Sequence, residues 1–199
     1  MSGVQHPDPG ESSPLGLAQA PVLCHRYSHI HDGLQMSDFD PTQYRLIPHG
    51  HSFEDFEPGR RFDHHWGRTL NEGDNSLFTT ATLVYNPLYF NAEFAKAHGH
   101  PDTVVNPFLV LCTVVGLSVE DLSEAGGPFL GIDELTFHAP VYPGDTLTAR
   151  SEVVSARESA SQPAFGVVTW HTEGFNQRGE LVIDYKRSNL ARKRRLQES

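Results

Sequence analysis

The sequence predicts an α+β fold in which a curved antiparallel sheet wraps around one buried helix. Residues 108–122 are apolar on nearly every face, which is typical of a helix enclosed by protein on all sides. Four long stretches of partly alternating apolar and polar residues follow, at 130–138, 146–156, 165–176 and 181–190, and turn signals separate them. A buried helix followed by several antiparallel strands favours a helix packed against one sheet.

Composition limits the classes of function. The chain has 199 residues, which suits one domain with tails, and its 20% charged and 38% hydrophobic residues are ordinary for a soluble globular protein. The formal net charge of −10 argues against a nucleic-acid partner. The longest apolar stretch, 108–117, is too short to cross a bilayer, and no signal peptide is recognisable. The two cysteines imply no disulfide framework, so a cytoplasmic location is expected, with Cys112 as a buried small apolar residue.

The chain divides into an arm, a domain and a tail. Residues 1–50 are rich in Pro, Gly, Ser and His and predict an extended or disordered arm. Residues 51–190 form the predicted domain, and residues 191–199 a basic, solvated C-terminal tail. The arm contains four side chains that can bind zinc, but their spacing matches no strong zinc pattern, so packing on a neighbouring subunit is the favoured role. These side chains are Cys24, His25, His29 and His31.

The first half of the domain is predicted to contain short elements. Residues 53–59 form an edge segment that ends in a Pro-Gly turn, and residues 61–67 form a strand. A helix then begins after the N-cap Asn71 and ends before Pro87, because the residue before a proline avoids the helical region. The apolar face of this helix comprises Leu77, Phe78, Ala81 and Val84.

A second short helix is predicted from Pro87 to Ala97, and Gly99 ends it. The buried helix follows, with Asn106 as its N-cap and Pro107 as its first residue. Along the strand at 146–156, one face is formed by Leu147, Ala149 and Val153.

Three runs of sequence carry a recognisable pattern. Residues 67–78 read GRTLNEGDNSLF, residues 84–95 read VYNPLYFNAEFA, and residues 135–147 read LTFHAPVYPGDTL. Together they resemble the MaoC-like (R)-specific enoyl-CoA hydratase family, whose first two motifs fit without a gap. Asn106 and the VGLSV run at 115–119 are most similar to the itaconyl-CoA and mesaconyl-CoA hydratase branch. The resemblance covers residues 53 to about 190 and implies the hot dog fold, together with activity on an acyl thioester of coenzyme A.

The same resemblance places the family's acid–base pair on two unusual residues. The catalytic Asp of the pattern falls on Val84 and the catalytic His falls on Tyr89. Val84 can neither donate nor accept a hydrogen bond and is expected to contact substrate only. A phenol has an ordinary pKa of about 10 and is a poor base at neutral pH, so Tyr89 either acts as an acid, orients a water, or only packs against its aromatic neighbours. Asn86 keeps its family position and is the second predicted catalytic residue, expected to orient a water or a substrate carbonyl.

The resemblance also implies a site for the thioester oxygen. In the family, backbone N–H groups at the start of the central helix hold this oxygen as the enolate develops, where the helix dipole favours negative charge. Here the position is Asn106-Pro107-Phe108. Pro107 has no N–H, so the Phe108 amide is the expected donor, and Asn106 either adds a side-chain donor or only caps the helix. These three residues and Val84 are the predicted substrate-binding set.

Other titratable residues have simpler explanations. Glu72 and Asp74 suit the first turn of a helix, where acidic groups are favourable. His64 and His65 lie on a predicted strand and point to opposite faces, and His138 lies on another strand. Each histidine is more simply an exposed or hydrogen-bonded residue than a catalytic base.

The sequence therefore predicts an acyl-thioester hydratase or dehydratase with a non-standard active site, acting on an enoyl-CoA or hydroxyacyl-CoA. No cofactor and no metal are expected. An exposed sheet edge makes a homodimer or higher homo-oligomer the expected assembly. Two alternatives stay open: a non-catalytic hot dog subunit or ligand-binding protein, and a different reaction on the same fold, such as thioester hydrolysis or a step of secondary metabolism.

Overall fold

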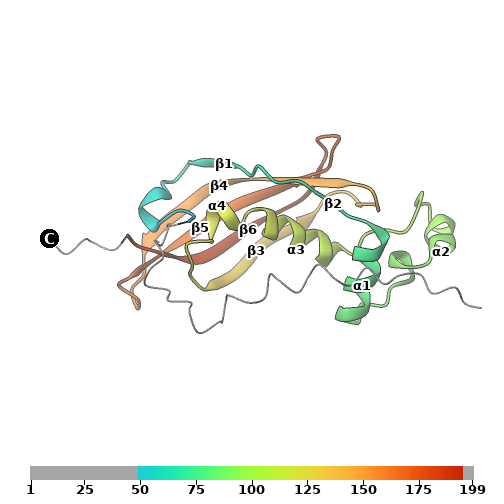
Figure 1. Ribbon diagram of the computed structural model, residues 1–199, viewed down its shortest axis with the longest axis horizontal. Coiled ribbons are helices and arrows are strands. Elements are labelled where there is room, and N and C mark those ends of the chain that lie inside the picture. The colour runs from blue at the N-terminus through green and yellow to red at the C-terminus, as the bar shows by residue number, and fades with distance from the viewer. Residues whose placement is uncertain (1–48, 195–199) are drawn as a thin grey trace, which may run out of the picture. The chain divides into compact units, whose positions relative to one another are not determined.

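The computed structural model describes residues 49–194, which form one antiparallel sheet and a series of helices (Figure 1). The predicted arm with its four zinc-binding candidates, and residues 195–199 of the tail, lie outside the described residues. The α-helices are α1 (Glu72–Thr82), α2 (Ala92–Ala97), α3 (Pro107–Leu117) and α4 (Val119–Leu122), and the 3-10 helices are η3 (Phe53–Asp55) and η4 (Pro87–Tyr89). The strands are β1 (Arg61–Asp63), β2 (Arg68–Thr69), β3 (Phe129–Phe137), β4 (Thr146–Glu158), β5 (Phe165–Phe175) and β6 (Leu181–Arg192).

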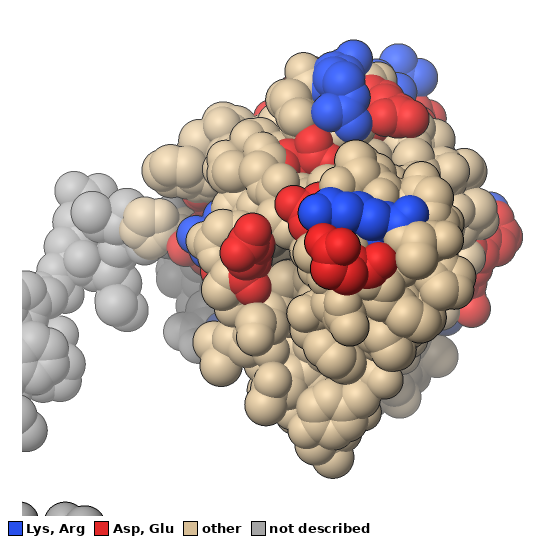
Figure 2. Space-filling model, turned by 90° about the vertical axis from the view of Figure 1, so that its right-hand side faces the viewer, with Lys and Arg blue, Asp and Glu red and all other residues tan. Residues whose placement is uncertain are grey.

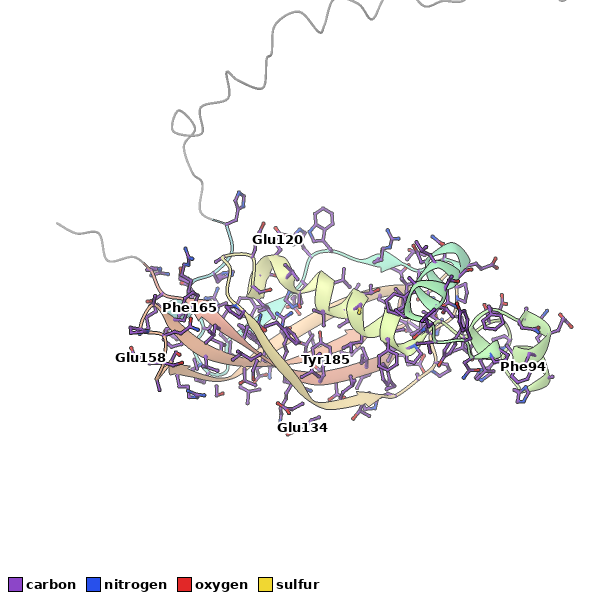
Figure 3. All side chains as sticks on the ribbon, turned by 90° about the horizontal axis from the view of Figure 1, so that it is seen from below. Phe94, Glu120, Glu134, Glu158, Phe165 and Tyr185 are labelled. Atoms are coloured by element: carbon purple, nitrogen blue, oxygen red, sulfur yellow. The ribbon has the colours of Figure 1, made fainter. Side chains whose placement is uncertain are left out.

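The sheet has the strand order β1-β4-β5-β6-β3, with the short β2 paired to β4, and every pairing is antiparallel. The long helix α3 runs along one face of this sheet, above Tyr185 (Figure 3). The helix packs tightly on β5 at Gly174, where an added Cβ atom would lie 2.7 Å from a methyl group of Val114. The predicted architecture, a sheet curved around one helix, is therefore present.

Alternation along the strands sorts the sheet into an inner and an outer face. Leu147, Ala149 and Val153 are buried on β4, as their spacing predicts. The inner residues form two apolar clusters. The first cluster surrounds the N-terminal part of α3 and comprises Leu70, Val105, Val110, Val114, Val141, Leu147, Ala149, Val182, Ile183 and Tyr185. The second cluster comprises Phe56, Phe62, Leu122, Val153, Val168, Trp170 and Ala191.

A chain of polar side chains lies on the inner face of the sheet beside these clusters. The His64 Nε2 atom lies 2.9 Å from the Ser151 hydroxyl, which lies 2.8 Å from the Thr172 hydroxyl. The other ring nitrogen of His64 lies 2.6 Å from a carboxylate oxygen of Asp121, just after the start of α4. This hydroxyl chain ties the segment just after β1 to β4, β5 and α4. Arg187 is also buried and its guanidinium stacks on Trp170, 5.4 Å from the ring centre.

The central helix differs from its prediction in length and in burial. The predicted helix at 108–122 is broken, because α3 ends at Leu117 and α4 begins at Val119, with Ser118 between them. The prediction of burial on every face is wrong. The sheet covers only one side of α3, so Phe108 is 51% exposed, and Cys112, predicted to be buried, is exposed as well. Val119, at the start of α4, is 40% exposed.

The apolar face predicted for α1 is also wrong. Leu77 is 74% exposed, and the helix buries Asn75 and Thr79 instead. Polar residues are buried here because α1 packs on loop backbone, whose carbonyl and amide groups need hydrogen-bond partners. The helix ends at Thr82, and Leu83 adopts the left-handed conformation with φ of 59°. Val84 therefore lies beyond the helix.

Smaller differences concern element boundaries. The single helix predicted from Pro87 to Ala97 is divided into η4 and α2, because Asn91 is extended and its side chain caps α2. The edge segment predicted at 53–59 contains η3. The strand predicted at 61–67 is shorter, because β1 ends at Asp63, and β2 begins only at Arg68, just beyond the predicted range. No helix among residues 49–194 is long and apolar enough to cross a membrane.

Candidate active site

A buried asparagine on α1 organises the site. Asn75 is 1% exposed, and its amide nitrogen donates to two backbone carbonyls, those of Tyr89 at 2.8 Å and Val104 at 3.0 Å. Its side-chain oxygen accepts from the backbone N–H of Asn106 at 2.8 Å. One side chain therefore fixes α1 to the end of η4 and to the segment that enters α3.

The polar groups of Asn106, at the start of α3, all have hydrogen-bond partners within the protein. Asn106 is fully buried, and its side-chain oxygen accepts from the Phe108 N–H at 3.0 Å. The carbonyl of Asn106 accepts from the next two N–H groups, those of Leu109 and Val110. The side-chain nitrogen of Asn106 lies 3.4 Å from the Thr79 hydroxyl. Asn106 thus caps the helix, and the Phe108 N–H, the predicted donor to the thioester oxygen, is already used by that cap.

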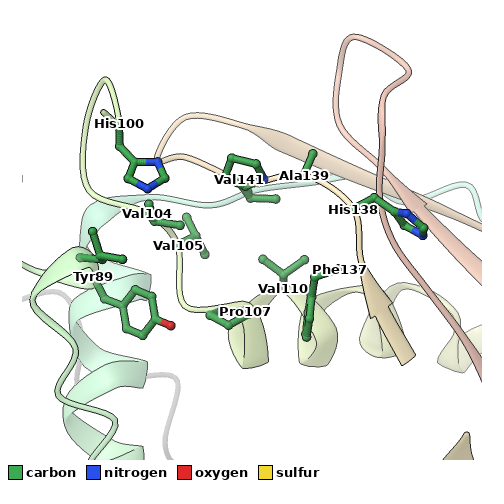
Figure 4. Close-up of a pocket in the computed structure, with 12 residues that line it drawn as sticks. Tyr89, His100, Val104, Val105, Pro107, Val110, Phe137, His138, Ala139 and Val141 are labelled. Atoms are coloured by element: carbon green, nitrogen blue, oxygen red, sulfur yellow. The ribbon is translucent and has the colours of Figure 1, made fainter. Parts of the chain in front are cut away.

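A cavity of about 300 Å³ lies beside this junction (Figure 4). Its walls come from η4, from the chain before α3, from the first turn of α3, and from the end of β3 with the loop that follows. Most of the lining is aliphatic or aromatic, which suits an acyl chain. The lining residues are Leu88, Tyr89, His100, Val104, Val105, Pro107, Val110, Phe137, His138, Ala139, Pro140 and Val141.

The predicted site residues are only partly brought together. Tyr89 and Pro107 line the cavity, whereas Val84, Asn86, Asn106 and Phe108 do not. The Asn86 side chain is exposed and accepts from the Leu88 N–H at 3.1 Å, so it caps η4. Asn86 therefore positions the turn that carries Tyr89, and its direct role in catalysis stays a prediction.

Two histidines in the cavity wall, His100 and His138, were not among the predicted catalytic or substrate-binding residues. His100 lies 3.0 Å through its Nδ1 atom from the hydroxyl of Tyr142. His138 Nε2 lies 2.7 Å from one oxygen of Asp184, whose other oxygen lies 2.8 Å from His171 Nε2. In Figure 4 the rings of His100 and Tyr89 lie at one end of the apolar row, and the ring of His138 lies at the other end.

The turn that follows β3 fixes one side of the cavity. Asp145 accepts from the Tyr142 N–H at 2.9 Å, from Gln177 at 2.7 Å and from Arg178 at 3.2 Å. Burial alone would raise the pKa of the Asp145 carboxyl, but these hydrogen bonds and the Arg178 charge hold the pKa below its ordinary value. The turn also pairs with Val105, whose N–H donates to the Val141 carbonyl at 2.8 Å. The ionised Asp145 carboxylate therefore holds the turn in place beside the segment that leads into α3.

Charged side chains near the site lie close to side chains of opposite charge. Figure 2 shows the end of the domain that carries α1 and α2, where uncharged surface dominates and basic and acidic groups lie side by side. Two ion pairs in this part are Arg68 with Asp74 at 2.9 Å and Lys96 with Glu93 at 3.2 Å. Among residues 49–194 there is no group of three or more His, Cys, Asp or Glu side chains that could hold a metal ion.

The basic C-terminal residues lie at the other end of the sheet (Figure 1). The Lys193 amine lies 2.9 Å from Glu158, and Arg194 pairs with Asp55 on η3. The Lys193 pair joins the residues after β6 to the end of β4, and the Arg194 pair joins them to η3 at the start of the domain.

The chain matches the mesaconyl-CoA hydratase family over residues 41–199. The chain belongs to this family. Among its relatives, the mesaconyl-CoA hydratase of Haloarcula hispanica is 40% identical over 169 residues, which cover 82% of this chain and 47% of that protein. The MaoC-like resemblance read from the three sequence runs is thereby confirmed.

Solved structures of other proteins agree with the fold of this mesaconyl-CoA hydratase family member. A MaoC domain protein from Chloroflexus aurantiacus superposes with a TM-score of 0.70 at 34% identity, covering 76% of this chain and 43% of that one. A Mycobacterium tuberculosis protein with a double hotdog fold superposes with a TM-score of 0.63 at 25% identity, covering 75% and 46%. The expected hot dog fold is confirmed, and the chain spans about half the length of these relatives.

Sequence reasoning missed the residues that hold the site together. Asn75 lies inside the 67–78 run, but nothing in the sequence indicates its three backbone partners. The contact between His100 and Tyr142 joins residues 42 positions apart, in two loops. The one available signal was the position of Tyr142 inside the Pro-Val-x-x-Gly-Asp turn. The assignment of the family's acid–base positions to Val84 and Tyr89 stays a prediction.

Proposed function

We propose that this protein adds water to a 2-enoyl thioester of coenzyme A, or removes water from the corresponding hydroxyacyl thioester. The observation that carries the proposal is the apolar cavity at the start of α3, bounded by Tyr89, in a member of the mesaconyl-CoA hydratase family. The acyl group would lie in the cavity, with its thioester oxygen near the N-terminal end of the helix dipole. To receive a hydrogen bond there, the oxygen would share the Phe108 N–H with the Asn106 side chain.

Within this proposal, Tyr89 contacts the reacting part of the substrate and Asn86 holds the turn that positions it. The phenol would orient the attacking water or donate a proton, since hydroxyl groups do both. Val84 would serve only as an apolar neighbour of the turn. No cofactor enters the reaction, because water and the polarised thioester supply all the atoms required.

The test is a direct assay of the full chain. Hydration removes the conjugated double bond, so we expect the ultraviolet absorbance of mesaconyl-CoA or crotonyl-CoA to fall when the protein is added. Tyr89→Phe should reduce the rate, and Asn86→Ala should reduce it through the loss of the η4 cap. The proposal is wrong if the protein leaves both thioesters unchanged and neither substitution alters the result. Release of free thiol would indicate thioester hydrolysis instead.

A second candidate function, a non-catalytic subunit that completes the site of a partner, is favoured by one observation. The Phe108 N–H, the donor expected to hold the thioester oxygen, is occupied by the cap. If this candidate holds, the isolated chain is inactive, and activity returns when a partner with an intact Asp and His is added.

We further infer that the protein is a homodimer or a higher homo-oligomer. The outer edge of β3 has no neighbouring strand among the described residues, and it carries exposed Phe129, Leu130 and Phe137. The uncovered side of α3 exposes Phe108 and Cys112. Unpaired strand edges and exposed apolar faces are typical of interfaces. Light scattering on the purified chain measures the mass of the assembly. A cytoplasmic location stays a prediction.

A further inference from the structure

The cavity wall contains only three titratable side chains among its twelve lining residues, namely Tyr89, His100 and His138. The two histidines differ in what holds them. His138 is bound through Nε2 to the Asp184 carboxylate, which also holds His171. In Figure 4 the His138 ring points away from the row of apolar side chains, whereas the His100 ring lies on the same side as Tyr89. His100 is therefore the imidazole that shares one end of the cavity with the Tyr89 phenol.

The backbone holds His100 in this place. Gly99 has a φ of 87°, a conformation that glycine adopts without strain, and it ends α2. The N–H of His100 then donates to the Ala95 carbonyl at 3.1 Å, which turns the chain back over the last turn of the helix. The His100 side chain is half-buried, so it is partly screened from solvent while its ring lines the cavity.

Tyr142 holds the ring of His100 from the opposite loop. Its hydroxyl lies 3.0 Å from Nδ1, and its backbone N–H is bound by Asp145 at 2.9 Å. Burial and the nearby Asp145 charge both raise the pKa of the Tyr142 phenol, so it stays neutral at ordinary pH. A neutral phenol oxygen can accept from the Nδ1–H, which leaves Nε2 of the imidazole without a proton and able to accept one.

We propose that His100 is the acid–base residue of this active site, held by Tyr142 and facing the substrate together with Tyr89. This inference rests on the proposed hydration reaction. In the forward step, the water oxygen forms a bond to the β-carbon while the C=C π electrons move through the α-carbon to the thioester oxygen. The water proton goes to His100 Nε2. The imidazolium then returns a proton to the α-carbon, the enolate collapses to the thioester, and His100 is again neutral.

This assignment gives the three groups separate tasks. His100 moves the proton, because an imidazole, unlike a phenol, exchanges protons readily near neutral pH. Tyr89 orients the water through its hydroxyl. Tyr142 accepts from Nδ1–H both when the ring is neutral and when it is an imidazolium, so it is a positioning residue and does not touch the reacting atoms.

The experiment compares His100→Asn with the matched control His98→Asn, in the full chain with mesaconyl-CoA and crotonyl-CoA. Asn keeps a polar group near the position of Nδ1 but lacks the nitrogen that carries the proton. His98 is exposed, stacks on Phe94 and does not line the cavity. We expect kcat to fall by about 10²- to 10⁴-fold in His100→Asn, the range typical of a lost general acid–base group, with KM little changed. The control should keep the wild-type rate.

Two further measurements separate catalysis from structure. Thermal unfolding shows whether His100→Asn is folded, and His100→Gln, whose amide lies nearer to the position of Nε2, replaces it if it is not. Tyr142→Phe should lower kcat less than His100→Asn and should shift the acidic limb of the pH–rate profile, which a purely structural role would leave in place. His138→Asn should keep that limb unchanged.

The outcomes are distinct. If the wild-type chain hydrates the thioester and a folded His100→Asn variant keeps its kcat within about tenfold, below the range of a lost acid–base group, the role of His100 is overturned while the hydration proposal stands. If the wild-type chain acts on neither thioester, both proposals are overturned together.

Discussion

The strongest test of the site's architecture is the removal of Asn75. Asn75→Ala deletes three hydrogen bonds, to the carbonyls of Tyr89 and Val104 and from the N–H of Asn106, at distances of 2.8, 3.0 and 2.8 Å. Each such bond contributes about 0.5–1.5 kcal/mol net, and a buried group left without a partner costs about 1–3 kcal/mol. Since Asn75 and Asn106 are almost fully buried, water cannot replace the lost partner without local opening.

We therefore expect Asn75→Ala to lower the free energy of unfolding by about 3 kcal/mol. For a chain of this size the corresponding loss in Tm is about 6–12 °C. Urea denaturation followed by circular dichroism gives the free energy, and a thermal scan gives the Tm. The enoyl thioester assay should also show a lower rate, because the carbonyl of Tyr89 is released from α1.

Two variants on the same helix make this test specific. Ser76→Ala changes the exposed neighbouring residue and should alter stability by no more than about 0.5 kcal/mol. Asn75→Asp keeps the acceptor for the Asn106 N–H but loses both donated bonds, so it should also be destabilised. If Asn75→Ala unfolds within about 1 °C of the wild-type protein, well inside the shift that one kcal/mol causes, the reasoning that one side chain joins the three segments is wrong.

Three other outcomes follow from the packing and charges. Gly174→Ala should destabilise the protein by about 1–3 kcal/mol because its Cβ would lie 2.7 Å from α3, whereas Gly116→Ala, which meets nothing within 4 Å, should be neutral or stabilising in denaturation experiments. Asp145→Asn should cost about 1–3 kcal/mol at neutral pH. The pKa of Asp145 is lower in the folded protein than in the unfolded chain. The ionised carboxylate therefore contributes its full stabilisation above the unfolded pKa of about 3.9, and this contribution is lost as pH falls through the folded pKa. The wild-type protein and the variant should reach equal stability only in acid. Leu130→Lys, on the exposed edge of β3, should shift the assembly towards monomers in light scattering, and an unchanged mass would argue against an interface there.

The four long strands were predicted well because burial on one face leaves a visible record in the sequence. Leu147, Ala149 and Val153 alternate with polar residues, and that alternation alone places them on the inner face. The N-cap Asn71 was likewise readable, since its side chain accepts from the Asp74 N–H as capping requires. Local rules of this kind need no knowledge of distant segments.

The helices were harder because their burial depends on what covers them. Leu77 is apolar but faces outward, while the polar Asn75 and Thr79 face inward towards backbone groups of other loops. Cys112 lies on the side of α3 that the sheet leaves open. Periodicity identifies a face of a helix, and it does not say whether that face meets apolar side chains, backbone or solvent.

The candidate site contains residues that local sequence patterns reveal and residues that only distant contacts bring into place. The resemblance led to Tyr89 through the run at 84–95 and to Pro107 through the start of the central helix, and both residues line the cavity. His100 could not be found in the same way, since its partner Tyr142 lies in a different loop and only the fold brings the two together. Contacts between loops are the part of an active site that a single sequence records least.

The separation of the interior into two apolar clusters affects how this protein can change over time. Val105, Val110 and Val141 belong to the first cluster and also form the cavity wall, whereas the second cluster has no residue in that wall. Substitutions that adapt the cavity to a larger or smaller acyl group would therefore be absorbed within the first cluster. The second cluster, with the hydroxyl chain and the Arg187–Trp170 stack, would keep the sheet folded while specificity drifts.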